Sequence, residues 1–301
     1  MKAGIVLLIK GIGVGAANII PGVSGGTLLW SLGLYSAFIR ALKAWDIETL
    51  QCLFRGRFRD VLRRIQARWL AVLGLGITLG LLGLARIIDP LLSTYPVPTY
   101  AFFFGLVAGS VYLLAREIPA LSWGAVLAFF IGLMTMPTML QLAPAQADSS
   151  FFYLFLCGIA AMAGMLLPGF SGSLLLIVLG NYGLVVEAIA RMDMSVLLPF
   201  SLGMAIGLVS MARLIFWFLN AYRTIAVALI TGLIVGALPH LWPWGQEPYG
   251  LPPSLMDPYL VFPLLLAALG VWIAVLANAP GPNSSSTVDV SDSPDDAVQP
   301  E

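Results

Sequence analysis

The residues best suited to bind a ligand lie in a short motif that occurs twice. Residues 21–27, the first motif, read Pro-Gly-Val-Ser-Gly-Gly-Thr, and residues 168–174, the second motif, read Pro-Gly-Phe-Ser-Gly-Ser-Leu. Proline lacks a backbone N–H and glycine permits backbone angles barred to other residues, so each motif interrupts a helix. A helix that restarts at the serine presents unpaired N–H groups and a hydroxyl. That combination can bind a phosphate or a carboxylate.

The candidate binding residues come from both motifs, from one polar residue before the first motif and from two arginines. They are Asn18, Pro21, Gly22, Ser24, Gly25, Gly26, Thr27, Arg86, Pro168, Gly169, Ser171, Gly172, Ser173 and Arg213. An alternative is that the glycines only let two half-helices cross while the serine caps one of them. Paired interruptions in corresponding halves of a membrane protein point to a binding site, so we favour binding.

Arg86 and Arg213 occupy matching positions near the C-terminal ends of two predicted membrane spans. A guanidinium stays charged and pairs with phosphate through two hydrogen bonds. An ionisable group inside a membrane segment costs at least about 2.5 kcal/mol, which makes it a functional candidate. Anchoring at the membrane surface is an equal alternative, because each arginine is near the end of its span. Glu187 is interpreted as an interfacial charge rather than a proton carrier.

The chain that carries these residues has the composition of a membrane protein. Of its 301 residues, 59% are hydrophobic and 10% are charged, which excludes an ordinary soluble globule. Cys52 and Cys157 have no C-x-x-C neighbour, so both are expected to be free thiols. His240 is the single histidine, which excludes a multi-histidine metal centre. No metal and no cofactor are expected.

Apolar segments predict several membrane-spanning helices. A span needs about 20 apolar residues, and six segments have about this length: 69–89, 99–115, 120–140, 195–219, 224–242 and 258–277. One helix through 4–39 would be ~54 Å long at 1.5 Å per residue, so the first motif marks a turn. The second motif does the same within 151–190. Each turn creates a helix hairpin that either re-enters the membrane or spans it.

Positive charge predicts the orientation. Eight of the 15 basic residues lie in 40–68, which places this segment in the cytoplasm by the positive-inside rule. Its interleaved aromatic and aliphatic residues are typical of an amphipathic helix lying on anionic lipid. We therefore predict a multi-pass protein of the cell (inner) membrane, with both termini cytoplasmic and a disordered acidic tail at 279–301.

The repeat extends beyond the motifs. Pro168 lies 147 positions after Pro21, whereas Gly203 lies 127 positions after Gly76, so the first half carries an insertion at 40–68. Gly74, Gly76, Gly80 and Gly83 are predicted to let helices pack closely. We predict an all-α polytopic membrane protein with one membrane domain, 1–278, built as an inverted-topology repeat. Its repeats cover about 4–140 and 151–278, each a broken re-entrant helix hairpin plus three transmembrane helices.

The doubled motif, with the Leu-Leu and Leu-Gly-x-Tyr that follow it, resembles a bacterial and archaeal family. The family is described as polyprenyl-phosphate (undecaprenyl-phosphate) transporters, and the resemblance covers about 4–278, most specifically 15–27. It implies a non-enzymatic carrier that returns the phosphorylated polyprenol from the outer to the cytoplasmic leaflet for reuse in cell-envelope glycan synthesis. The family often has aspartate where this chain has Asn18, so a role that needs a carboxylate there does not carry over.

Three other function classes are considered, one of them a purely structural or assembly role. A secondary transporter of a small soluble anion would use the same architecture with a closed, water-filled cavity. A membrane enzyme is disfavoured, because His240 is alone and no nucleophile–base pair is evident. The expected partners are polyprenyl phosphate, membrane lipids and either a coupling proton or a sodium ion, with no nucleic acid.

Overall fold

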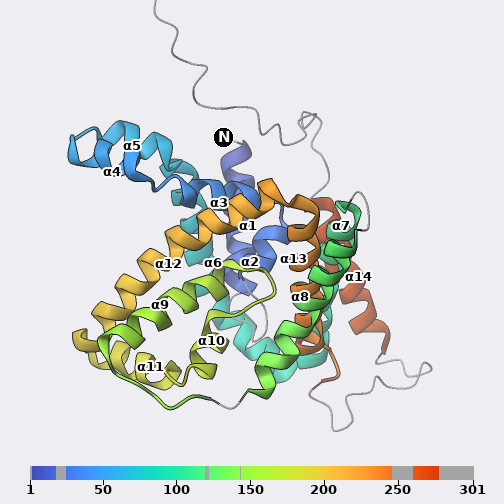
Figure 1. The fold of residues 1–301 in the computed structure, drawn as a ribbon. Helices are drawn as coiled ribbons and strands as arrows, with labels where there is room; N and C mark the ends of the chain where they lie inside the picture. Colours follow the sequence, from blue (N-terminus) through green and yellow to red (C-terminus); the bar gives the residue numbers. More distant parts are fainter. Residues whose placement is uncertain (1, 18–24, 119–121, 143, 246–259, 278–301) are drawn as a thin grey trace, which may run out of the picture.

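The structure is a computed structural model that describes residues 2–17, 25–118, 122–142, 144–245 and 260–277. The regular structure of these residues is entirely helical (Figure 1), which confirms the predicted all-α class. Four described helices are long and apolar enough to cross a membrane, and six spans result if each of two bent helix pairs counts as one.

Each motif is followed by two short helices in the same order. The first half contains α1 (Lys2–Ala17), α2 (Gly25–Ser31) and α3 (Tyr35–Lys43), and the second contains α9 (Phe151–Leu166), α10 (Gly172–Val178) and α11 (Tyr182–Arg191). Both α2 and α10 have seven residues. At 1.5 Å per residue, α10 is only ~10 Å long and cannot cross about 30 Å of hydrocarbon.

The apolar run 172–190 is not one helix as its hydropathy suggests, because Gly180 breaks it. Gly180 has φ +74°, and its counterpart in the first half, Gly33, has φ +69°. This left-handed conformation is the usual C-terminal signal of a helix, and glycine adopts it without strain. α10 and α11 therefore meet at 111°. The Leu-Gly-x-Tyr that both halves share is thus a second turn after each motif.

Each half of the described chain also contains three longer helices. They are α6 (Ala67–Thr94), α7 (Pro96–Arg116) and α8 (Trp123–Gln141), then α12 (Met194–Ala221), α13 (Arg223–Ala237) with its continuation η1 (Leu238–Leu241), and α14 (Val261–Ala277). α6 and α12 have 28 residues each. α1 packs on α6 and α9 on α12, whereas α7 packs on α14 and α8 on α13. The last two pairings exchange helices between the halves and tie them into one body.

Glycines let these helix pairs approach closely. A Cβ on Gly76 would lie 2.6 Å from the carbonyl oxygen of Leu8, and one on Gly203 would lie 2.0 Å from that of Phe155. Gly80 is packed equally tightly against α1, as predicted. The prediction for Gly74 and Gly83 is wrong, since neither has an atom within 4 Å of its Cβ position. These two glycines lie on faces of α6 that do not contact α1.

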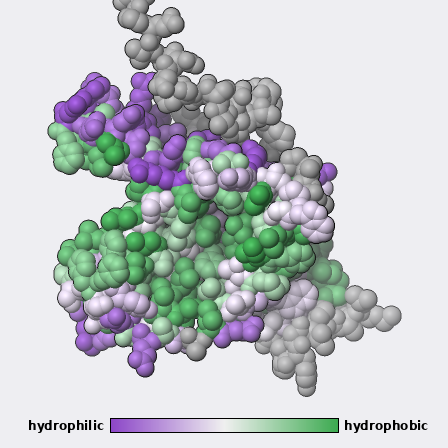
Figure 2. Space-filling view, in the orientation of Figure 1, coloured by the Kyte–Doolittle hydropathy of each residue, from purple (hydrophilic) through white to green (hydrophobic). Residues whose placement is uncertain are grey.

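The basic segment forms two short helices rather than one. α4 (Ile47–Phe54) and α5 (Phe58–Arg64) are joined at Gly56, whose φ is +71°. Figure 2 shows hydrophilic surface over α4 and α5 at one end of the molecule and over α11 at the other, with a hydrophobic band between them. A hydrophobic band between two polar ends is what a multi-pass membrane protein presents.

The Gly180 turn provides a test of the fold. A Cβ at this position would lie 2.0 Å from the carbonyl oxygen of Ala145, in a conformation that alanine avoids. Gly180→Ala should lower the free energy of unfolding by about 1–3 kcal/mol, measured by thermal unfolding in detergent. Gly183→Ala is the matched control, because Gly183 has open space around its Cβ position. Equal stability of the two variants would contradict the described turn.

Candidate functional site

The two motifs lie in direct contact. The backbone N–H of Gly169 donates a 2.7 Å hydrogen bond to the hydroxyl of Thr27, which is 3% exposed. A Cβ on Gly26 would lie 3.2 Å from the carbonyl oxygen of Leu166. Gly169 itself has φ +79°, and a Cβ there would lie 2.5 Å from the backbone of Leu233 in α13. The second motif is therefore held between α2 and α13.

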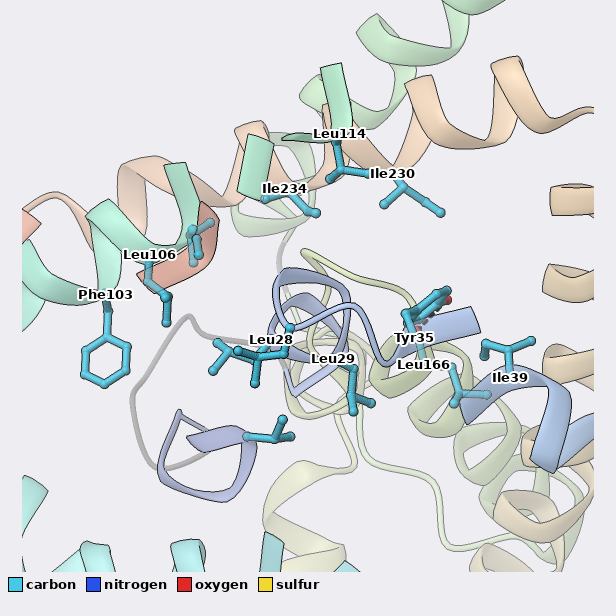
Figure 3. Packing of buried hydrophobic residues seen from close by; sticks show 14 of the residues in the cluster. Leu28, Leu29, Tyr35, Ile39, Phe103, Leu106, Leu114, Leu166, Ile230 and Ile234 are labelled. Carbon is cyan, nitrogen blue, oxygen red and sulfur yellow. Dashed lines mark hydrogen bonds between the residues drawn. The ribbon is translucent and has the colours of Figure 1, made fainter. Parts of the chain in front are cut away.

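A second hydrogen bond joins the halves at the same place. The hydroxyl of Tyr35, at the start of α3, donates to the carbonyl of Leu166 at 3.0 Å. Figure 3 shows Tyr35 and Leu166 close together, with Leu28 and Leu29 of α2 beside them and Ile234 of α13 nearby. Tyr35 is the tyrosine of the repeated Leu-Gly-x-Tyr, and its hydrogen-bond partner could not be predicted from the sequence.

A pocket of about 370 Å³, the motif pocket, lies beside the second motif. Its polar side chains in the described part of the chain are Ser171, Ser173 and Tyr182, and no charged side chain lines it there. The hydroxyls of Ser171 and Ser173 share a 2.8 Å hydrogen bond. Apolar side chains of α9, α11 and α12 form the remaining walls. The pocket can thus bind a small polar group at the serines and an apolar chain beyond them.

The hydroxyl of Ser171 is not used for capping. Ser171 is the residue before α10, but its side chain makes no hydrogen bond to the backbone of that helix. Gly172 does allow a close crossing, because a Cβ there would lie 2.3 Å from the carbonyl oxygen of Ala161 in α9. The close helix crossing that the structural interpretation expects is therefore present at Gly172, whereas the serine cap that it expects is absent; Ser171 instead lines the pocket.

Several predicted site residues are not placed beside the motif pocket. Arg213 donates a 2.7 Å hydrogen bond to the carbonyl of Trp45, between α3 and α4. Burial raises the pKa of neighbouring Asp46, but hydrogen bonds from Thr49 and the charges of Arg64 and Arg213 outweigh it and lower this pKa overall.

The remaining predicted residues are only partly described. Arg86 lies within α6, but its side chain is outside the described part. Four other predicted site residues lie outside the described part of the chain: Asn18, Pro21, Gly22 and Ser24.

Other polar residues have clear local roles. Glu187 forms a 2.8 Å ion pair with Arg191 one turn later on α11, and both side chains are more than half exposed, which fits an interfacial charge. Cys52 and Cys157 are free thiols, as predicted. Lys10, which was not among the predicted site residues, donates a 2.6 Å hydrogen bond to the carbonyl of Leu32. Its position as a single cation inside the apolar run 4–20 could have identified it from the sequence.

Comparisons with known proteins agree on one family. A family model described as undecaprenyl phosphate translocase-like matches residues 14–251. A polyprenyl-phosphate transporter of Vibrio cholerae is 33% identical over 238 residues, which cover 79% of this chain and 77% of that protein. A polyprenyl-phosphate transporter of Staphylococcus aureus is 29% identical over 267 residues, covering 83% and 88% respectively. No solved structure matches the chain.

The contact between the motifs can be tested at Thr27. Thr27→Val keeps the side-chain shape but leaves the buried N–H of Gly169 without its acceptor, which should cost about 1–3 kcal/mol of stability. Thermal unfolding in detergent measures the loss. Thr231→Val is the control, because that buried hydroxyl bonds only within its own helix, to the carbonyl of Val227. A Thr27→Val protein as stable as the control would contradict the described junction.

Proposed function

Because the chain belongs to the undecaprenyl phosphate translocase-like family, we propose that it transports polyprenyl phosphate across the membrane. The direction we propose is from the outer to the cytoplasmic leaflet, which returns the lipid carrier for reuse in cell-envelope glycan synthesis. The observation that carries the proposal is the motif pocket, which combines serine hydroxyls with apolar walls at the junction of the two motifs. The named relatives are transporters, and no catalytic step is proposed.

The pocket matches the chemistry of this lipid. Polyprenyl phosphate has an anionic headgroup and a long apolar tail, so its binding site needs hydrogen-bond donors at one end and an apolar path at the other. Ser171, Ser173 and nearby backbone amides supply the donors in our proposal. Val186 and Ile189 line the pocket and are 48% and 58% exposed, so one wall continues into the lipid-facing surface. This opening favours a lipid over a small soluble anion, which would need an enclosed cavity.

The proposed transport path uses an inverted repeat in one membrane domain, 1–278. Equal lengths of α2 and α10 and of α6 and α12 support two equivalent halves, 4–140 and 151–278. The first hairpin opens toward the basic segment 40–68 and the second toward the opposite surface. Hydrophilic residues at both ends of the molecule support this arrangement. The headgroup then moves between two openings that share the Thr27–Gly169 junction, while the tail stays in lipid.

The two arginines act at the ends of this path in our proposal. Arg213 lies at the α3–α4 connection, on the side that the basic segment assigns to the cytoplasm. There it would neutralise the phosphate as the lipid leaves. Arg86 holds the equivalent position in the first half and would act at the outer opening. Neither arginine has to enter the motif pocket for this role.

The serine pair gives the most direct functional prediction. Ser171→Ala with Ser173→Ala should weaken binding of labelled polyprenyl phosphate to the purified protein at least about tenfold, because hydrogen bonds to a charged group are lost. Transport into vesicles should fall with binding. Ser210→Ala is the control, since that hydroxyl bonds carbonyl groups of its own helix. Unchanged binding in the double variant would remove the serines from the site.

Arg213 makes a separate prediction. Arg213→Ala should slow transport about fivefold, equivalent to about 1 kcal/mol for one cation near the membrane surface. Arg213→Lys should retain most of the rate because it retains the charge. Arg191→Ala is the control, an exposed arginine on α11 at the other end of the molecule. A lysine variant as slow as the alanine variant would show that Arg213 serves only to hold Trp45.

A further inference from the structure

A larger pocket of about 860 Å³, the basic groove, lies away from the motif pocket. It is bounded by the N-terminal half of α1, by α5 and by the start of α6. Three cations line it: Lys10, Arg63 and Arg68. Its walls are apolar, and no acidic side chain lines it in the described part of the chain. The groove therefore combines a positive mouth with an apolar interior.

In the second half a neutral group makes a hydrogen bond similar to the one that Lys10 makes in the first half. Lys10 donates to the carbonyl of Leu32 at the end of α2. In the second half, the neutral hydroxyl of Tyr153 donates to the carbonyl of Leu179, the equivalent of Leu32, at 2.9 Å. A phenol thus makes the same bond without placing a charge in an apolar helix, where a charge is costly. Lys10 therefore brings to the groove a positive charge that this hydrogen bond does not itself require.

Arg63 and Arg68, at the mouth of the groove, add two further positive charges. Ion pairs in the described part of the basic segment join Arg57 to Asp60 and Arg64 to Glu48. None of the ion pairs found among the described residues includes Arg63 or Arg68, and both are exposed. Arg68 lies in the first turn of α6, next to Trp69, which also lines the groove. Lysine and arginine clusters at the cytoplasmic end of membrane helices attract anionic lipids.

We propose that the basic groove binds an anionic phospholipid of the surrounding membrane. Its phosphodiester lies between Lys10, Arg63 and Arg68, and its acyl chains follow the apolar walls. Val6 and Leu62 are 52% and 55% exposed, so these walls continue into the lipid-facing surface. The occupant is a resident lipid rather than the transported one, because no described residue of either motif lines the groove. The bound lipid links α5 to α1 and, through Lys10, to the end of α2.

The experiment measures lipid binding to the full-length purified protein in detergent, by native mass spectrometry with phosphatidylglycerol and phosphatidylcholine. Phosphatidylglycerol should bind tightly and phosphatidylcholine weakly. Arg63→Gln with Arg68→Gln should weaken phosphatidylglycerol binding about thirtyfold, from roughly a fivefold loss per cation. Lys10→Gln, which keeps a donor for the Leu32 carbonyl, should weaken it about fivefold. The matched control, Arg55→Gln with Arg59→Gln, removes two exposed cations of the same segment outside the groove and should change binding less than twofold.

Three results would overturn the proposal. Equal losses in the groove variant and the control would indicate general attraction to the basic segment. Equal binding of both phospholipids to the wild-type protein would show that charge is not recognised. Tight binding of polyprenyl phosphate that is lost in Arg63→Gln with Arg68→Gln, without phosphatidylglycerol binding, would assign the groove to the transported lipid. Circular dichroism establishes whether each variant is folded. If the double variant does not fold, Lys10→Gln still tests the proposal, because it leaves α5 and both arginines at the mouth unchanged.

Discussion

The structure depends on how two helix interruptions satisfy their backbone groups away from water. Unpaired N–H and C=O groups at membrane depth cost several kcal/mol each, so an interrupted helix is tolerated only where protein supplies partners. Here the first half supplies them to the second. The hydroxyl of Thr27 accepts from the Gly169 amide, and the hydroxyl of Tyr35 donates to the Leu166 carbonyl. The second interruption therefore exists only in contact with the helices that follow the first.

This dependence of the second motif on the first half explains why small residues are found where they are. Gly26 and Gly169 let the two motifs touch backbone to backbone, and Gly76 and Gly203 bring α1 and α9 against the long helices α6 and α12. With these helices packed closely together, the motif pocket lies beside the second interruption rather than inside a closed bundle. The pocket has serine hydroxyls at one end and half-exposed apolar side chains in one wall, which fits the amphipathic lipid proposed as its substrate.

Much of this could be predicted from the sequence because it is local or periodic. Proline and glycine locate the helix breaks, hydropathy locates the long helices, and the repeated glycines at 76 and 203 locate close contacts. Partners that depend on three-dimensional packing could not be found in this way. The bond from Gly169 to Thr27 joins residues 142 positions apart, and nothing in the local sequence pairs them. Gly74 and Gly83 belong to the same glycine-rich run as Gly76, but both have open space around their Cβ positions.

In the proposed mechanism, the phosphate of a polyprenyl lipid binds beside the second motif. A density map of the protein with polyprenyl phosphate bound would show where the headgroup lies. We expect phosphate density within hydrogen-bonding distance of the Ser171 and Ser173 hydroxyls, with the first isoprene units along α11 toward Val186 and Ile189. Headgroup density elsewhere, with the motif pocket empty, would contradict it.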